Sequence, residues 1–116
     1  MAKEVVPGNP GAPFAKAVKI SGMMFTSGNC AAGDGIQAQT RQILSNLEEI
    51  LKAEGTALKD VVKATVYLTN MADFSAMNET YVEIFGDDRP ARTTVGVKEL
   101  ARDDFLIEID LVVALG

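Results

Sequence analysis

The longest regular pattern of apolar residues in the chain has the spacing of a helix. The side chains that recur every three or four positions are Ile36, Thr40, Ile43, Leu44, Leu47, Ile50 and Leu51. Charged residues such as Arg41 and Glu48 fall on the opposite side. Asp34 and Gln37 have the spacing of a capping box, and Gly55 stands where a helix commonly ends. The pattern therefore predicts one long amphipathic helix.

A second helical pattern follows Asp73, a residue type that often caps a helix. Its apolar side carries Phe74, Met77, Tyr81, Ile84 and Phe85. Gly86 is expected to end this helix before the polar turn of residues 87–90.

Apolar and polar residues alternate in the other regular segments, which is the period of a β-strand with two different faces. The strands expected from this alternation are residues 17–20, 23–27 and 62–69, a strand that begins near Arg92, and residues 106–115. The turn Ser21-Gly22 separates the first two, which are expected to form a hairpin. The glycine-rich stretch 8–11 lacks the spacing of a dinucleotide site or a P-loop, so we interpret it as a structured loop.

This order of elements predicts an α+β fold in which two helices cover only one face of a sheet. Leu106, Val112 and Ala114 are expected on the other face. A soluble monomer seldom exposes that much apolar surface, so the chain is expected to form a homo-oligomer with pockets where subunits meet.

Composition narrows the possible functions. The 116 residues, 47% of them hydrophobic, fit a single domain that spans residues 1–116. Because the chain has no histidine, it cannot build a Ser-His-Asp or Cys-His system, and no metal site is expected. The net charge of −5 argues against nucleic acid as the main partner.

The single cysteine and the absence of long apolar runs bear on location. Cys30 cannot form an internal disulfide, and packing is the simplest interpretation of it. The first residues lack the pattern of a signal peptide, and no segment approaches the roughly 20 apolar residues of a membrane span. We therefore expect a cytoplasmic protein without a membrane partner.

Arg92 and Glu108 are the candidate catalytic residues. Arg92 follows the rigid Arg89-Pro90 turn, and its planar guanidinium can hold a small carboxylic acid through two charge-assisted hydrogen bonds. Glu108 lies within an apolar strand and can act as a general acid or base beside a bound water. The pair suits a site that grips a carboxylate and positions water next to it.

Several blocks of the chain occur in an order typical of one protein family. They are Phe25-Thr26-Ser27-Gly28, the segments 39–47, 60–68 and 73–81, Arg89-Pro90-Ala91-Arg92, and Ile107-Glu108-Ile109. Over residues 14–113 the chain resembles the RidA (YjgF-type) reactive-intermediate deaminases, also catalogued as L-PSP endoribonucleases.

This resemblance implies a chorismate-mutase-like fold, with a mixed sheet and two helices on one face, and a homotrimer with clefts between its subunits. It implies hydrolytic deamination of small enamine or imine acids, such as 2-aminoacrylate and 2-iminopropionate, to 2-keto acids and ammonia. No cofactor is expected, since the pyridoxal phosphate that generates such substrates belongs to the upstream enzyme. The family positions that line the cleft add the substrate-binding candidates Phe14, Ser27, Gly28, Asn78, Tyr81 and Thr94.

The chain departs from the family pattern at three places. Phe14 stands where a tyrosine is common, and phenylalanine cannot donate a hydrogen bond. Thr94 stands where a cysteine is frequent, and the segment 29–36 is shorter than usual.

Structural roles remain open for each candidate. Arg92 could pair with Asp87 or Asp88, and Glu108 could form an ion pair at a subunit edge. Ser27 could serve a turn. Asn78 and Tyr81 could simply pack on their helix.

Two other functions are considered for the protein. One is a non-catalytic trimer that binds or senses carboxylates such as 2-keto acids. The other, which fits the negative net charge less well, is a ribonuclease or translation inhibitor.

Overall fold

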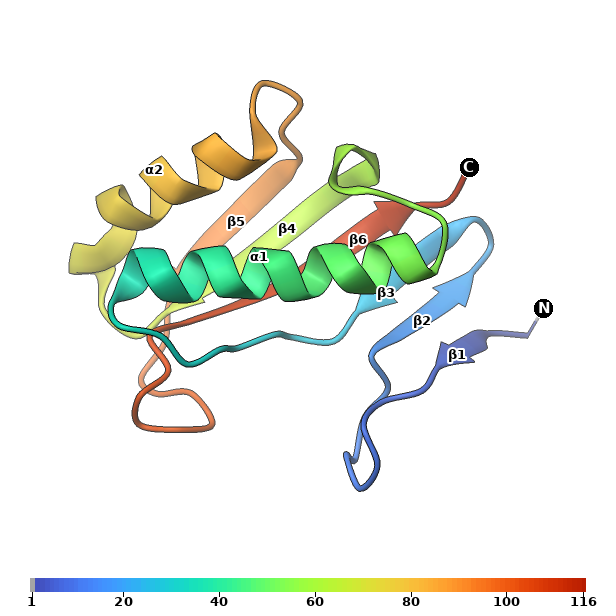
Figure 1. Cartoon of the computed structure of the whole chain (residues 1–116), viewed down its shortest axis with the longest axis horizontal. Coiled ribbons are helices and arrows are strands. Elements are labelled where there is room, and N and C mark those ends of the chain that lie inside the picture. The colour runs from blue at the N-terminus through green and yellow to red at the C-terminus, as the bar shows by residue number, and fades with distance from the viewer. Residues whose placement is uncertain (1) are drawn as a thin grey trace.

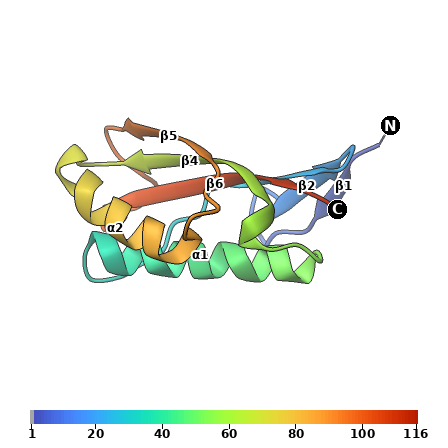
Figure 2. The same cartoon turned by 90° about the horizontal axis from the view of Figure 1, so that it is seen from above.

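The computed structural model describes residues 2–116 and has two helices packed on a six-stranded mixed sheet. Both helices lie on the same side of the sheet, and the other face is uncovered (Figures 1 and 2). The predicted α+β fold with two helices on one face is confirmed.

The strands follow the predicted alternation, with one addition at the N-terminus. Their bounds are β1 Glu4–Val6, β2 Ala17–Ile20, β3 Met23–Thr26, β4 Val61–Leu68, β5 Ala91–Gly96 and β6 Ile107–Ala114. The order across the sheet is β1-β2-β3-β6-β4-β5. Only β4 and β5 pair in parallel, and the other neighbours are antiparallel. The prediction missed β1, which is short and is followed at once by Pro7 and Gly8.

The predicted hairpin of β2 and β3 is present. Ile20 pairs with Met23, and the two turn residues between them, Ser21 and Gly22, have φ of 50° and 76°. Two consecutive positive φ angles are typical of the tight turn whose twist matches that of the strands.

The long helix α1 spans Ile36–Ala53, as the apolar stripe predicted, but its predicted cap is wrong. Gly35, with φ of 95°, occupies the N-cap position, and no side chain caps the helix. Gln37 instead donates to the Ala76 carbonyl and to Glu79. At the other end Gly55 has a φ of 76°, as predicted for a C-terminal glycine.

Helix α2 spans Phe74–Phe85, and Gly86 ends it with a φ of 70°, as predicted. Asp73 does not cap it, because Asp73 is already in a helical conformation and makes no capping hydrogen bond. A 3-10 turn, Met71–Asp73, precedes the helix, and the Asn70 side chain accepts a hydrogen bond from the Ala72 amide at 2.9 Å. The capping contact therefore comes one turn earlier than predicted.

The core lies between the helices and the covered face of the sheet. Seven residues of β4 and β6 that face the helices are at most 1% exposed: Ala64, Val66, Leu68, Ile107, Ile109, Leu111 and Val113. They pack with Ile43, Leu44, Leu47, Leu51 and Met77 of the helices. This burial supplies most of the favourable free energy of the fold.

The uncovered face carries apolar residues, as predicted. Ile20, Phe25, Val62 and Val95 are 36%, 46%, 44% and 38% exposed. Val112 pairs with Phe25 and Ala114 with Met23, and all four are on this face. Leu106 was also expected here, but it precedes β6 and packs against the core. We call this surface, lined by Ile20, Phe25, Val62, Val95 and Val112, the open face.

Candidate functional site

Arg92 lies on the helix-covered side of β5 and is held by α2. It pairs with Ala64 of β4, whose side chain is in the core, so the Arg92 side chain turns toward the helices. Its Nη2 donates to Asn78 Oδ1 at 2.7 Å, and Nη1 lies 3.7 Å from Met77 Sδ. The guanidinium carbon lies 4.7 Å from the centroid of the Tyr81 ring and 5.7 Å from that of Phe74. Three predicted site residues therefore meet here.

The charge of Arg92 has no acidic partner among residues 2–116. The alternative pairing with Asp87 or Asp88 does not occur. A half-buried cation is normally compensated by an anion. Cation–π contacts with two rings offset part of the cost of burial. The remaining donors of the guanidinium are available to a carboxylate.

Among residues 2–116, hydroxyls without a hydrogen-bond partner occur at the predicted residue Tyr81, which contacts Arg92, and at one further predicted residue, Thr94 of β5. In the described part of the chain, the buried hydroxyl oxygens without a hydrogen-bond partner belong to Thr80, Tyr81 and Thr94. Burial raises the pKa of Tyr81 to about 12, although Arg92 and Arg89 act in the opposite direction. The Tyr81 hydroxyl therefore stays protonated and able to donate. Buried polar groups without a partner are uncommon and call for a water or a ligand.

Glu108 lies on β6 between the buried residues Ile107 and Ile109, so its side chain points to the open face. The Cys30 thiol donates to Glu108 Oε1 at 3.3 Å. The other oxygen, Oε2, lies against Gly28, where a Cβ atom would be only 2.1 Å from it. The Glu108 carboxylate occupies the space that a side chain at position 28 would fill, so any larger residue there would displace it. In the described residues Glu108 forms no ion pair.

A second acidic group stands near Glu108 on the same face. Tyr67 is opposite Glu108 across β4 and β6, and its hydroxyl donates to Asp110 Oδ2 at 2.8 Å. This hydrogen bond, more than burial, raises the pKa of Tyr67. Asp110 is therefore engaged by Tyr67, whereas Glu108 is engaged by Cys30.

The structure does not bring Arg92 and Glu108 together within one chain. The two side chains project from opposite faces of the same sheet, since Arg92 shares the face of Ala64 and Glu108 alternates with Ile107 and Ile109. The candidate site is therefore divided into two parts. Arg92, Asn78, Tyr81 and Thr94 make up one part, which we call the Arg92 half, and Glu108 and Gly28 make up the other, the Glu108 half. Any site that uses both residues needs a second copy of the chain.

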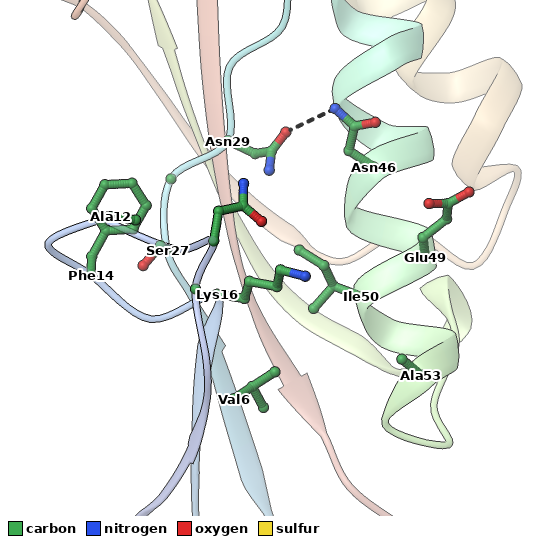
Figure 3. A pocket seen from close by; sticks show the side chains of 13 residues that line it. Val6, Ala12, Phe14, Lys16, Ser27, Asn29, Asn46, Glu49, Ile50 and Ala53 are labelled. Carbon is green, nitrogen blue, oxygen red and sulfur yellow. Dashed lines mark hydrogen bonds between the residues drawn. The ribbon is translucent and has the colours of Figure 1, made fainter.

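Phe14, Ser27 and Gly28 line a cavity of about 540 Å³ (Figure 3). The cavity lies between the N-terminal segment, residues 6–16, and the C-terminal half of α1. Its polar lining includes Lys16, Asn46 and Glu49. Ser27 Oγ donates to the Ala15 carbonyl at 2.7 Å, which is a structural role. The side chain of Phe14 is 59% exposed. Neither Arg92 nor Glu108 lines this cavity.

Sequence reasoning missed two kinds of contact. Phe74 and Met77 were placed on the apolar side of a helix, and both also contact Arg92. For Cys30, packing was the simplest interpretation, and no partner was predicted. Its pairing with Glu108 joins residues 78 positions apart, and no local pattern indicates it.

Two general features concern other classes of site. No helix within residues 2–116 is long and apolar enough to cross a membrane. In the same residues, no three metal-ligating side chains of the Cys, Asp or Glu type gather in one place.

Comparison with known proteins identifies relatives along nearly the whole chain. The family model described as endoribonuclease L-PSP matches residues 6–115. A RutC family protein of Pyrococcus horikoshii is 43% identical over 112 residues, covering 89% of this chain and 87% of the relative. The mitochondrial protein mmf2 of Schizosaccharomyces pombe is also 43% identical over 112 residues, covering 90% and 89%.

Solved structures of similar chains share the fold. A putative endoribonuclease of Thermotoga maritima superimposes with a TM-score of 0.88 at 37% identity, covering 100% of this chain and 99% of the other. RidA of an Antarctic Psychrobacter species superimposes with a TM-score of 0.86 at 29% identity, covering 95% and 94%.

Proposed function

Because the chain belongs to the endoribonuclease L-PSP family, which includes the RidA and YjgF proteins, we propose that it hydrolyses small enamine or imine acids to 2-keto acids and ammonia. Substrates of the 2-aminoacrylate and 2-iminopropionate type carry one carboxylate and one electrophilic carbon. Hydrolysis of such a substrate needs a cation that binds the carboxylate and a general acid or base beside the electrophilic carbon.

The observation that carries this proposal is the uncompensated charge of Arg92. Its guanidinium is oriented by Asn78 and by the Tyr81 ring, and no carboxylate of residues 2–116 pairs with it. A fixed planar cation of this kind can bind a carboxylate through two parallel hydrogen bonds. The substrate's carboxylate takes the place of the missing acidic partner.

Glu108 supplies the proton transfers. An enamine first becomes the imine by gaining a proton at C3 and losing one from nitrogen. Water then adds to the carbon of the C=N bond while the carboxylate takes a proton from the water and the nitrogen gains one. The resulting carbinolamine breaks its C–N bond as its hydroxyl proton is removed and its nitrogen is protonated, so that the products are a keto acid and ammonia. Positioned proton transfer of this kind contributes roughly 10²- to 10⁴-fold to a rate.

The working unit is a homotrimer in which one subunit contributes Arg92 and its neighbour contributes Glu108. Two observations support this arrangement: the two residues lie on opposite faces of one sheet, and the open face exposes Phe25 and Val62. Packing of open faces against one another would bury this apolar surface. The Glu108 halves would then lie at the subunit boundaries.

Mixing two inactive variants tests both the reaction and the shared site. Arg92→Ala and Glu108→Gln are each expected to lose most turnover of freshly generated 2-aminoacrylate, measured as pyruvate or ammonia released. After the two are unfolded together and refolded at equal amounts, roughly one quarter of the clefts combine an intact Arg92 with an intact Glu108. Activity should return toward that fraction. If the mixture stays as inactive as its components, the shared site is wrong.

Matched controls make the test specific. Arg41→Ala removes an exposed arginine that pairs with Glu83, and Asp110→Asn changes the neighbouring acid on the face of Glu108. Both should retain most of the turnover. If the unmodified chain binds 2-keto acids but accelerates no deamination, the protein is a carboxylate sensor. In that case Glu108→Gln leaves the binding unchanged.

RNA cleavage and location are separate questions that the relatives' names raise. The family description contains the word endoribonuclease, but a chain with net charge −5 has little attraction for phosphate backbones. RNA cleavage that falls with Arg92→Ala would support that activity, and RNA cleavage whose rate is unchanged by the substitution would indicate a contaminating nuclease.

We keep the cytoplasm as the proposed location, although mmf2 is named as mitochondrial.

A further inference from the structure

We propose that Cys30 is a positioning residue for Glu108, whose thiol holds one carboxylate oxygen so that the other is left to accept a proton from water. The role in turnover rests on the proposed function. The contact itself does not, and it can be tested separately.

The register of the sheet brings the two residues together. After β3 ends, Asn29 forms an isolated bridge with Ile109, with hydrogen bonds of 2.8 and 3.1 Å in the two directions. This register sets Cys30 directly opposite Glu108 on the open face. Directly opposed residues of antiparallel strands have close side chains. The resulting distance from Cys30 Sγ to Glu108 Oε1 is 3.3 Å.

Gly28 defines the place of the second oxygen. Since a Cβ at this position would lie 2.1 Å from Oε2, the carboxylate reaches over a bare backbone. No hydrogen bond from residues 2–116 is directed at Oε2, whereas Oε1 has the thiol. The two oxygens of Glu108 are therefore distinct, and Oε2 is the one without a donor among residues 2–116.

The thiol is suited to donate rather than to attack. Burial, and then the hydrogen bond and negative charge of Glu108, raise the pKa of Cys30 to about 12. At neutral pH the thiol is therefore protonated, and Cys30 is a persistent donor and a poor nucleophile.

The other titratable groups on this face are accounted for. Tyr67 faces Glu108 from β4, but its hydroxyl donates to Asp110. Lys63, also on β4, donates to Thr93 Oγ1 at 2.6 Å. Within the described residues, Cys30 is the group that donates to Glu108.

The contact is tested by titrating the only thiol in the chain. The ultraviolet absorbance of the thiolate would be followed against pH in the wild type and in Glu108→Gln, with Cys30→Ala as the blank for tyrosine ionisation. The wild-type thiol should ionise far above the usual range. In Glu108→Gln it should ionise at lower pH, because the negative charge is gone while burial remains. Identical titrations in the two proteins would overturn the contact.

The positioning role is tested by two substitutions of different donor capacity. Cys30→Ala removes the donor, and Cys30→Ser keeps one at nearly the same place. For Cys30→Ala, kcat should fall roughly 10-fold with KM nearly unchanged. Cys30→Ser should retain most of the wild-type kcat.

The outcomes separate the two claims. A wild-type kcat in Cys30→Ala, or equal losses of kcat in the alanine and serine variants, would overturn the positioning role. Absence of turnover in the wild type would overturn the proposed function and this role with it. The thiolate titration would still decide whether Cys30 and Glu108 are paired.

Discussion

The covered and open faces of the sheet each carry one half of the candidate site, and they hold it differently. On the covered face, Arg92 is fixed by side chains of α2: an amide from Asn78 and the ring of Tyr81. On the open face, Glu108 is fixed by the neighbouring strand segment, through the Cys30 thiol and the space left by Gly28. One half depends on helix packing, and the other depends on strand register.

This difference follows from the two-residue period of strands. Alternation places consecutive side chains on opposite faces, so a residue paired with the core position Ala64 cannot share a face with Glu108. Each half is well ordered in one chain, yet neither is complete. In the proposed trimer, the exposed apolar residues of the open face decide whether Arg92 of one subunit and Glu108 of the next come together.

The largest expected effect comes from disrupting the open face. Phe25→Glu places a charge where the proposed trimer buries an aromatic ring, and burying an unpaired charge is strongly unfavourable. The variant should sediment as a monomer and lose turnover to the background rate, although Arg92 and Glu108 are untouched. Val82→Glu on α2, at a similarly exposed position, is the control and should remain assembled and active.

The free energy of unfolding should respond differently to substitutions on the two faces of the sheet. Ile109→Ala creates a cavity in the core and should cost about 2–5 kcal/mol at any protein concentration. Val112→Ala on the open face should cost less in dilute, dissociated protein. Its cost should increase once the chains assemble. Denaturant unfolding over a range of protein concentrations measures both. A concentration-independent cost for Val112→Ala would mean that the open face is not an interface.

Much of the fold could be predicted from the sequence, because it depends on local periodicity. The stripe from Ile36 to Leu51 defined α1, and the alternation from residue 106 onward defined β6. The predicted side-chain caps were wrong at Asp34, where Gly35 occupies the N-cap position, and at Asp73, where the capping contact comes from the earlier turn at Asn70. The start of α2 directly after Asp73 is as predicted.

The candidate residues could be named from the sequence, but their arrangement could not be predicted from it. The faces of Arg92 and Glu108 depend on which strands pair, and β5 pairs in parallel with β4 across an intervening helix. The Cys30–Glu108 contact depends on the single bridge between Asn29 and Ile109. Such long-range register is not encoded in a local pattern.

Gly28→Ala should perturb only the Glu108 half. The added methyl group would occupy the place of Oε2, so the carboxylate must move away from its present position. We expect kcat to fall by roughly 10- to 100-fold with little change in the binding of a 2-keto acid product, since misplacing a catalytic group by about 1 Å can have this effect. Gly22→Ala, in the distant β2–β3 turn, controls for general strain, because its φ of 76° also disfavours alanine. Equal losses in both variants would indicate destabilisation rather than displacement of Glu108.

The smallest expected effect comes from removing Asn78, which orients Arg92 but is not itself the carboxylate-binding group. Asn78→Ala removes one hydrogen bond to Nη2 and should raise KM by roughly 3- to 10-fold while kcat changes little. Asn46→Ala, an equally half-buried asparagine on α1, is the matched control. Asn78→Asp should be more harmful than the alanine variant, because the new carboxylate would pair with Arg92 and compete with the substrate for the same cation. If Asn78→Asp bound substrate better than Asn78→Ala, Arg92 would not be the carboxylate-binding group, and the proposed division between the two faces would be lost.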